Sequence, residues 1–373
     1  MSTTVEEIKK TEIGESKSPK LLLDSLEIKG YRCFEHLKIE KLGRVNLIVG
    51  KNNVGKTALL EALWVLVQGG DYQSIGQILQ VILHSRNEIP ETSESYLLEP
   101  QYNDSYKHLF YKRPNIKNEN LSSTIGTFER EITIETFDIL NGVKKEIQDN
   151  RRKRAVELSV TYKGAFDPVD FDINKYVKPI ERTPVKNLFV RANGESSESI
   201  PELWDEITLT DKEDLVIDSL NLILNEIISI NLIGYPKGSN NRIPVARSKR
   251  VSEPVPLKSF GEGMNRLLGI ALALVNCKDG ILLIDEIEIG LHYSVLPDVW
   301  KLIFKTAKDL NVQVFATTHS KDCVEAFAQI ANENDEKDDG MLIRLERHGE
   351  KIVAKTINED RLAQAVNHDV EVR

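Results

Sequence analysis

Hydrophobic and polar positions form a regular pattern at the start of the chain. Residues 26–39, LEIKGYRCFEHLKI, alternate with the period of a β-strand, and Gly30 interrupts the alternation. Residues 45–49 are a short apolar run, and after a loop the segment ALLEALWVLV is apolar over the length of a helix, without glycine or proline. The pattern predicts an antiparallel ribbon, a buried strand, a loop and a helix.

A second regular stretch begins at residue 256. It predicts a polar glycine loop (KSFGEGM), an amphipathic helix over 265–277, a buried strand (GILLIDE), a helix over 294–309, a strand (VQVFATTHS), a helix from 321, and a hairpin from 341–345 and 352–356. Strands that alternate with helices are typical of a mainly parallel sheet covered on both faces, so the fold class is α/β.

The middle of the chain is rich in asparagine, serine, glutamate and tyrosine, and it shows no repeat. Short pieces at 131–137 and 156–162 resemble strands, and 145–154 and 211–230 resemble helices. We therefore expect four parts: a flexible leader at 1–20, the two halves of one catalytic domain at 21–67 and 256–373, and an inserted helical or mixed region at 68–255.

Composition narrows the class of protein. With 40% hydrophobic and 29% charged residues in 373, the chain is an ordinary globular protein, which excludes disordered and fibrous classes. The longest apolar run, 267–275, is far short of the roughly 20 residues that cross a bilayer. Because residues 1–20 lack the apolar segment of a secretory signal, we expect a cytoplasmic protein without a membrane partner. Cys33, Cys277 and Cys323 lack metal-ligand spacing, which favours reduced packing residues.

The net charge of -9 excludes a free-standing nucleic-acid coat, which needs a surplus of basic side chains. Two local basic clusters remain, one at 151–154 and one formed by Arg242, Arg247, Lys249 and Arg250. Each could contact DNA phosphates or an acidic partner, or form a solvated face.

The loop between the first buried strand and its helix carries the clearest chemistry. It reads GKNNVGKT and fits the pattern G-x-x-x-x-G-K-S/T. In such a loop, backbone N–H groups surround phosphates, Lys56 reaches the β and γ phosphates, and the Thr57 hydroxyl binds Mg²⁺. ATP and Mg²⁺ are therefore the expected cofactors. The predicted nucleotide-binding residues of this loop are Gly50, Lys51, Asn52, Asn53, Val54, Gly55, Lys56, Thr57 and Ala58.

Two later strands end in further polar residues. GILLIDE delivers Asp285 and Glu286 to the carboxyl edge of a sheet, where α/β proteins place ligands. There Asp285 can hold Mg²⁺ together with Thr57, and Glu286 can activate the attacking water. His319, at the end of VQVFATTHS, can contact the γ-phosphate. Glu286, His319 and Lys56 are the predicted catalytic residues.

The loop before the amphipathic helix is a second candidate for anion binding. Ser259, Gly261, Glu262 and Gly263 lie at a helix N-terminus, where backbone N–H groups favour negative charge. Because GKNNVGKT already covers one side of the nucleotide, this second loop suggests a second subunit that closes on the γ-phosphate. Alone, the same residues could form a simple N-cap loop.

The ordered set GKNNVGKT, SFGEG, LLIDEIEIGLH and ATTHS resembles the ABC-type ATPases. DEIEIGLHYS with TTHS is similar to the branch of the overcoming-lysogenization-defect (OLD-like) proteins, which includes ATPase subunits of the anti-phage systems PARIS and Gabija. The resemblance implies an ABC-type P-loop head and places the loop after the acids at a dimer interface. That loop carries Glu288, Gly290, Leu291 and His292.

Other positions match this resemblance in part. Arg32 corresponds to an N-terminal arginine common in the family, with either a role near the nucleotide or a surface ion pair. Phe260 stands where ABC proteins usually carry glycine, and the Q-loop residue is left open among Gln68, Gln73 and Gln77. These departures from the transporter pattern make coupling to a membrane domain doubtful.

We expect an ATP-driven switch in anti-phage defence, a homodimer or higher homo-oligomer through its ATP sites. Because too few residues follow His319 to form a nuclease domain, the effector, a Toprim-type nuclease or a toxin, is expected to be a separate protein. The alternative is an SMC-like DNA repair ATPase, although no sustained heptad pattern appears. A transporter subunit is less favoured. An ATP-binding scaffold without turnover is also less favoured, because the chain has a complete set of hydrolytic residues, namely Lys56, Asp285, Glu286 and His319.

Overall fold

The computed structural model describes residues 21–68, 72–86, 107–113, 121–127, 131–138, 156–163, 169–172, 185–193, 199–234, 242–333 and 339–367. Their strands are β1 (Leu26–Tyr31), β2 (Phe34–Ile39), β3 (Val45–Val49), β4 (Ser122–Gly126), β5 (Glu131–Asp138), β6 (Val156–Lys163), β7 (Val169–Asp172), β8 (Asn187–Val190), β9 (Ile227–Gly234), β10 (Arg242–Ser248), β11 (Val255–Pro256), β12 (Ile281–Ile284), β13 (Gln313–Thr317), β14 (Gly340–His348) and β15 (Lys351–Asn358). The helices are α1 (Lys56–Val67), α2 (Tyr72–His84), α4 (Ile200–Asp205), α5 (Asp211–Leu224), α6 (Glu262–Asn276), α7 (Leu296–Asp309), α8 (Lys321–Glu333) and α9 (Glu359–Asn367).

The sheet that carries the motifs has the strand order β15-β14-β3-β13-β12-β8. All neighbours in it are parallel except the β14–β15 hairpin. The predicted mainly parallel sheet is thus confirmed, and the ends of β3, β12 and β13 meet at one edge. That edge brings GKNNVGKT, the Asp285–Glu286 pair and the ATTHS segment together, although they are far apart in sequence.

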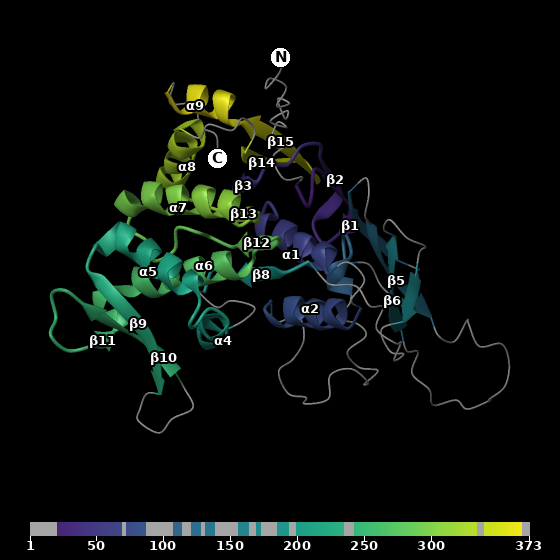
Figure 1. The fold of residues 1–373 in the computed structure, drawn as a ribbon. Helices are drawn as coiled ribbons and strands as arrows, with labels where there is room; N and C mark the ends of the chain where they lie inside the picture. Colours follow the sequence, from purple (N-terminus) through teal and green to yellow (C-terminus); the bar gives the residue numbers. More distant parts are fainter. Residues whose placement is uncertain are drawn as a thin grey trace, which may run out of the picture.

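Alternating side chains of the central strands fill two separate cores. Leu47, Leu282 and Val314 pack with α6, α7 and α8 on one face. Ile48, Leu283 and Phe315 pack with α1, α2 and the antiparallel strands on the other. Figure 1 shows α5, α6 and α7 on one side of the molecule and β1, β2, β5 and β6 on the other. Apolar burial on both faces explains why these strands read as nearly continuous hydrophobic runs.

The middle of the chain contributes strands to the central sheet and to an antiparallel sheet beside it. A six-stranded sheet of order β2-β1-β4-β5-β6-β7 continues the predicted N-terminal ribbon, since β4 pairs with β1. β8 pairs with β12 at the edge of the central sheet. The range 68–255 therefore supplies a strand of the head itself, while the boundaries of the inserted region stay a prediction.

The prediction of one helix over 211–230 is wrong at its carboxyl end. α5 stops at Leu224 because Asn225 takes the left-handed conformation, with φ 47°, and closes the helix. Residues 227–234 then form β9, which pairs with β10 and β11 in a three-stranded antiparallel sheet. The predicted helix at 145–154 and the leader at 1–20 lie outside the described residues.

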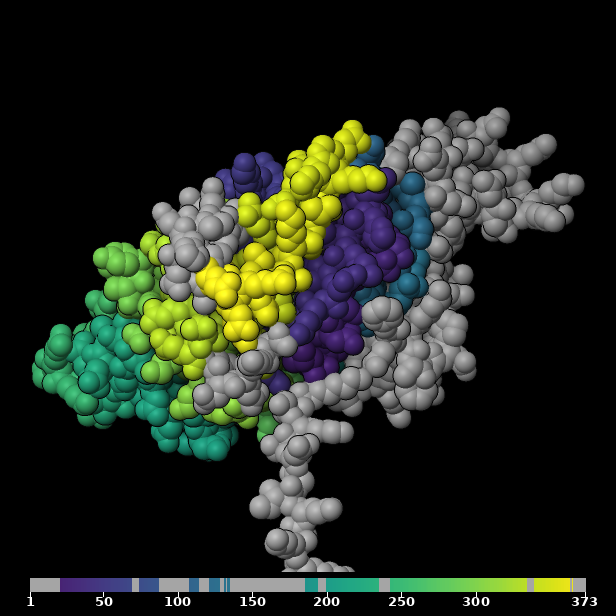
Figure 2. All heavy atoms as spheres, turned by 90° about the horizontal axis from the view of Figure 1, so that it is seen from above, coloured from purple at the N-terminus to yellow at the C-terminus, as the bar shows by residue number. Residues whose placement is uncertain are grey.

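The C-terminal hairpin is confirmed and is longer than predicted. Figure 2 shows these yellow strands against the purple N-terminal strands, where β15 packs beside β2. None of the helices in the described ranges is long and apolar enough to cross a membrane. Cys277 and Cys323 are buried and are not joined in disulfides, and burial raises the pKa of the Cys33 thiol.

Candidate functional site

The loop between β3 and α1 has the local geometry of a phosphate-binding loop. Gly55 precedes α1 with φ 99°, a left-handed conformation that favours glycine. A Cβ atom at Gly55 would lie 2.5 Å from the Cys33 sulfur and 2.9 Å from the Phe34 ring. The glycine is therefore required both by the turn and by the close approach of β2.

Lys56, the first residue of α1, folds back over this loop. Its Nζ donates to the Gly50 carbonyl at 2.8 Å and to the Lys51 carbonyl at 3.3 Å. Burial lowers the pKa of the Lys56 ammonium, and the nearby carboxylates of Glu286 and Asp285 oppose this shift. The loop thus holds a desolvated cation where the sequence places the β and γ phosphates.

Thr57 and Asp285 face each other across the loop. The Thr57 hydroxyl lies 3.1 Å from Asp285 Oδ2 and 3.3 Å from Oδ1. Two cis ligands of an octahedral Mg²⁺ ion, each at about 2.0–2.1 Å, would lie about 2.9 Å apart. The hard oxygen donors and their separation therefore fit Mg²⁺, as the sequence predicts for this pair.

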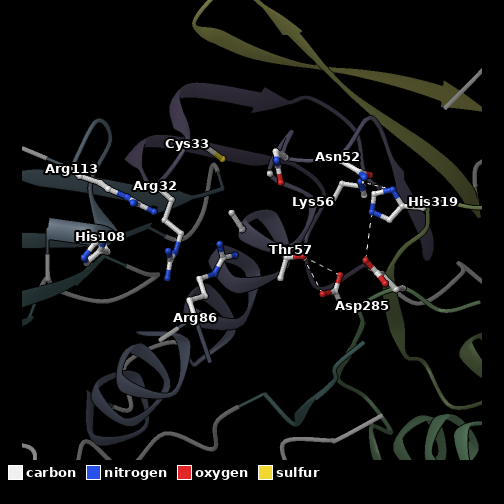
Figure 3. A pocket seen from close by; sticks show the side chains of 14 residues that line it. Arg32, Cys33, Asn52, Lys56, Thr57, Arg86, His108, Arg113, Asp285 and His319 are labelled. Carbon is white, nitrogen blue, oxygen red and sulfur yellow. Dashed lines mark hydrogen bonds and ion pairs between the residues drawn. The ribbon is translucent and has the colours of Figure 1, made fainter. Parts of the chain in front are cut away.

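His319 links the lysine to the second acid. Its Nδ1 lies 3.4 Å from Lys56 Nζ, and its Nε2 lies 3.5 Å from Glu286 Oε1. Glu288 accepts a hydrogen bond from the His319 backbone N–H at 2.8 Å, which fixes the start of the segment that follows β13. Figure 3 shows Lys56, Asn52 and His319 close together beside Asp285.

These residues line a cavity of about 820 Å³ that continues away from the acids. Its lining includes Asn52, Asn53, Gly55, Lys56, Thr57, Ala58, Asp285, Glu286 and His319, together with Arg32, Cys33, Arg86, His108 and Arg113. Figure 3 shows Arg32, Arg113 and His108 on the side of Thr57 opposite to Asp285 and His319. One end of the cavity is therefore acidic with a lysine, and the other end is basic.

Arg32 is held in a buried pair rather than a surface one. Its Nε lies 3.0 Å from Glu61 Oε2, and both side chains are about 5% exposed or less. Arg86 Nε lies 2.9 Å from the other oxygen of Glu61. The sequence singled out Arg32 but missed Arg86, His108 and Arg113, because they come from a stretch without a recognisable motif.

Arg266 lies in no recognisable motif, and it contacts the backbone of the two acids. It sits on α6 and donates to the carbonyls of Asp285 at 2.8 Å and Glu286 at 3.3 Å, and also to the carbonyl of Arg191. The side chain is buried, with 7% exposure. Its guanidinium satisfies carbonyls at the ends of β8 and β12 that the sheet leaves free, and so connects α6 to the acid pair.

The loop that begins α6 does not reach this cavity. Ser259, Gly261 and Glu262 are exposed, and none of the predicted residues of this loop, Gly263 included, lines the cavity. A Cβ atom at Gly263 would lie only 2.5 Å from the Gly290 carbonyl oxygen, so the loop packs against the loop after the acids. There Leu291 is partly buried, and His292 is exposed and caps a short 3-10 turn.

Residues from two further sequence predictions contact partners outside the cavity. Gln68 is buried at the end of α1 and donates to the Asn187 side chain at 2.9 Å, away from the phosphate loop. In the second basic cluster, Arg242 pairs with Asp205 at 2.7 Å and Arg250 with Glu226 at 2.7 Å. These two arginines therefore pair with acids of α4 and of the turn before β9. The first cluster, at 151–154, lies outside the described residues.

Comparison with known proteins finds one family model and several relatives that match this chain. Residues 45–322 match the family model described as "AAA domain, putative AbiEii toxin, Type IV TA system". The chain is 26% identical over 363 residues to an ATP/GTP phosphatase of Helicobacter pylori, covering 90% of this chain and 95% of that protein. It is 27% identical over 182 residues to the DNA replication and repair protein RecF of Bacillus mycoides, covering 47% of this chain and 46% of that protein.

Among solved structures, the chain aligns with an Smc head domain from Pyrococcus furiosus. That domain has an extended coiled coil and is bound to the C-terminal domain of ScpA, and the alignment covers 94% of this chain and 99% of that one. The identity is 11% and the TM-score 0.48. The family model covers well over half of the 373 residues and includes all three motifs at the sheet edge. The chain therefore belongs to the AAA-domain ATPases of the putative AbiEii toxin, type IV toxin–antitoxin family.

Proposed function

We propose that this protein binds ATP with Mg²⁺ and hydrolyses it. The observation that carries the proposal is the meeting of three distant segments at one sheet edge: Thr57 contacts Asp285, and His319 lies between Lys56 and Glu286. Each of these side chains is of the type that phosphoryl transfer requires at that place. The full-length similarity to an ATP/GTP phosphatase supports the same chemistry.

Each residue has a defined task in this proposal. Thr57 and Asp285 would hold Mg²⁺, which supplies positive charge to the β and γ phosphate oxygens. Lys56 binds the same phosphates from the loop, and the N-terminus of α1 adds backbone N–H groups. Glu286 accepts a proton from the attacking water, and His319 orients that water and contacts the γ-phosphate.

The site is completed by a second copy of the chain. The loop at 259–263, which is exposed at Ser259, Gly261 and Glu262, carries glycine and helix N-terminal N–H groups but stands outside the cavity of its own subunit. We propose that it covers the γ-phosphate of a partner, with Glu288, Gly290, Leu291 and His292 at the interface. ATP binding would then close a homodimer or a pair within a higher homo-oligomer, and hydrolysis would reopen it.

Light scattering tests this closure. The Glu286→Gln variant, which is expected to retain ATP, is measured with and without Mg²⁺-ATP. A mass that rises from one to two subunits only with Mg²⁺-ATP is the expected result. An assembly whose size is the same with and without nucleotide contradicts nucleotide-gated closure and points to a standing assembly held by other surfaces.

Gly263→Ala is expected to weaken ATP-driven association while nucleotide binding by the single subunit is unchanged. The added methyl would approach the Gly290 carbonyl to 2.5 Å and displace the loop after the acids. Such overpacking costs about 1–3 kcal/mol, and if the displaced loops form the interface, the association constant should fall by about fivefold to a hundredfold. Light scattering over a range of protein concentrations, with a fluorescent ATP analogue for binding, measures both quantities.

Gly269→Ala is the matched control, because it lies on the same helix and its Cβ would meet nothing within 4 Å. Its association should equal that of the unchanged protein. Equal weakening by both variants, or no weakening by Gly263→Ala, contradicts the assignment of this loop to the interface.

We further propose that the switch acts in the cytoplasm in anti-phage defence, as an OLD-like ATPase similar to those of PARIS and Gabija. Its effector would be a separate Toprim-type nuclease or toxin. The motifs DEIEIGLHYS and TTHS support this, as does the toxin–antitoxin description of the family. Cells carrying the protein with its neighbouring genes should resist phage, and Lys56→Ala should remove that resistance.

The second candidate is an SMC-like ATPase that processes DNA. The similarity to RecF favours it, since that protein's name assigns it to DNA replication and repair, although the match spans about half of each chain. ATP turnover measured with and without duplex DNA separates the two candidates. Stimulation by DNA that disappears at high salt supports DNA processing, whereas turnover independent of DNA, together with phage resistance, supports the defence role.

A further inference from the structure

We infer that Thr317 is a positioning residue that sets the geometry of both acids of the site through one hydroxyl group. The inference rests on the proposed ATP hydrolysis and extends it to a residue that is distinct from the predicted site residues. Thr317 is the last residue of β13 and is fully buried. Thr317 does not itself line the cavity, so its role is exerted through Asp285 and Glu286, which do.

The sheet register brings Thr317 to this position. β13 pairs in parallel with β12, with Ile284 opposite Ala316, so the next residues on the two strands are Asp285 and Thr317. On its other side Thr317 is paired with Ile48 of β3, just before the phosphate loop. Thr317 is therefore the central point of the edge at which all three motifs meet.

The hydroxyl of Thr317 holds the Asp285 carboxylate in place through one of its two oxygens. It donates to Asp285 Oδ1 at 2.6 Å, a length typical of a charge-assisted hydrogen bond. The Thr57 hydroxyl lies 3.1 Å from Oδ2 and 3.3 Å from Oδ1. Since Thr317 donates its single proton to Oδ1, Thr317 leaves Oδ2 available for the Mg²⁺ that Thr57 and Asp285 would hold.

The same hydroxyl holds the backbone of Glu286. Its oxygen accepts a hydrogen bond from the Glu286 N–H at 2.8 Å. Glu286 has φ 48°, a left-handed conformation that a non-glycine residue keeps only when surrounding contacts impose it. Arg266 holds the Glu286 carbonyl from the opposite side at 3.3 Å. The direction of the Glu286 side chain toward His319 thus depends on Thr317.

The next residue offers a matched comparison. Thr318 is as deeply buried, at 1% exposure, but its hydroxyl accepts from the Ser320 backbone N–H at 3.0 Å. Replacing either threonine with valine removes one buried hydroxyl at nearly constant shape. A general loss of packing should therefore affect both variants, whereas a loss of acid positioning should affect only Thr317→Val.

The test compares Thr317→Val, Thr317→Ser and Thr318→Val in the full-length protein. For Thr317→Val we expect kcat to fall roughly tenfold to a hundredfold, as for the loss of hydrogen bonds to charged groups. Binding of a fluorescent ATP analogue in EDTA should be unchanged, while the Mg²⁺ concentration that half-saturates the metal-dependent gain in binding should rise roughly tenfold. Thr317→Ser keeps the hydroxyl and should restore both quantities. Thr318→Val should leave the Mg²⁺ concentration for half-saturation unchanged, because the Thr318 hydroxyl holds Ser320 rather than either acid.

The proposal is overturned if Thr317→Val turns over ATP like the unchanged protein, if Thr318→Val raises the required Mg²⁺ concentration equally, or if serine does not rescue. A loss of binding in EDTA equal to that with Mg²⁺ also overturns it, because it indicates general damage to the pocket. Should Thr317→Val fail to fold, Thr317→Cys replaces it, since a thiol is only a weak donor. If the unchanged protein does not hydrolyse ATP, the proposed function fails, while the Mg²⁺ dependence of analogue binding still decides the role of Thr317.

Discussion

Replacing Lys56 with alanine is expected to lower the affinity for ATP at least about a hundredfold, or about 2.7 kcal/mol of binding free energy. The ammonium is the cation that the loop presents to the phosphates, and its loss also frees the carbonyls of Gly50 and Lys51 that it now holds. Titration with a fluorescent ATP analogue measures the change. The folded state should not be weakened greatly, because burial already disfavours the charged lysine.

An exposed lysine provides the control for this variant. Lys301 lies on the solvent side of α7, and its replacement by alanine should change neither affinity nor stability beyond the roughly 0.5 kcal/mol usual for surface sites. Normal ATP affinity of Lys56→Ala, with the thermal unfolding temperature retained, contradicts the assignment of GKNNVGKT as the phosphate loop. Unfolding of the variant would instead show that Lys56 acts mainly by closing the loop on itself.

Glu286→Gln is expected to bind ATP normally and to hydrolyse it a hundredfold or more slowly, within the 10²–10⁴ range for the loss of a general base. Glutamine has nearly the same size and keeps the backbone contacts to Thr317 and Arg266, so the turn at Glu286 should persist. Removing one negative charge near the γ-phosphate should leave affinity equal or improved. Single-turnover hydrolysis, with binding measured separately, tests both statements.

The nearby Glu288 is the natural comparison for Glu286. One of its carboxylate oxygens already accepts a hydrogen bond from the His319 backbone, which limits its freedom to take a proton from water. Glu288→Gln should therefore reduce turnover much less than Glu286→Gln. Unchanged turnover in Glu286→Gln, together with a large loss in Glu288→Gln, would transfer the role of base to Glu288.

Short motifs were enough to predict where the site lies along the chain. GKNNVGKT follows an apolar strand and precedes an apolar helix, and the acids and His319 each follow another apolar strand. The alternation of strands and helices then requires a parallel sheet whose carboxyl ends share one edge. The fold class and the meeting of these motifs could therefore be predicted from local patterns alone.

Other features could not be predicted because they depend on contacts between distant residues. Arg86, His108 and Arg113 enter the cavity from a stretch without a motif, and β8 joins the central sheet from within the region taken as inserted. The end of α5 was misplaced because helical and strand patterns run together at 211–230, and only the left-handed Asn225 separates them. Such choices are made by packing rather than by local propensity.

The sequence by itself predicted the kind of chemistry and the residues proposed to carry it, because a phosphate loop and strand-end acids are defined by spacing within a few residues. Only the tertiary structure decided how the side chains of those residues are oriented. The placement of the Asp285 carboxylate depends on a hydroxyl from the neighbouring strand, and the turn at Glu286 depends on Thr317 and Arg266 from two different elements. Hydrogen bonds of this kind follow from sheet register and helix placement, which no local stretch of sequence encodes.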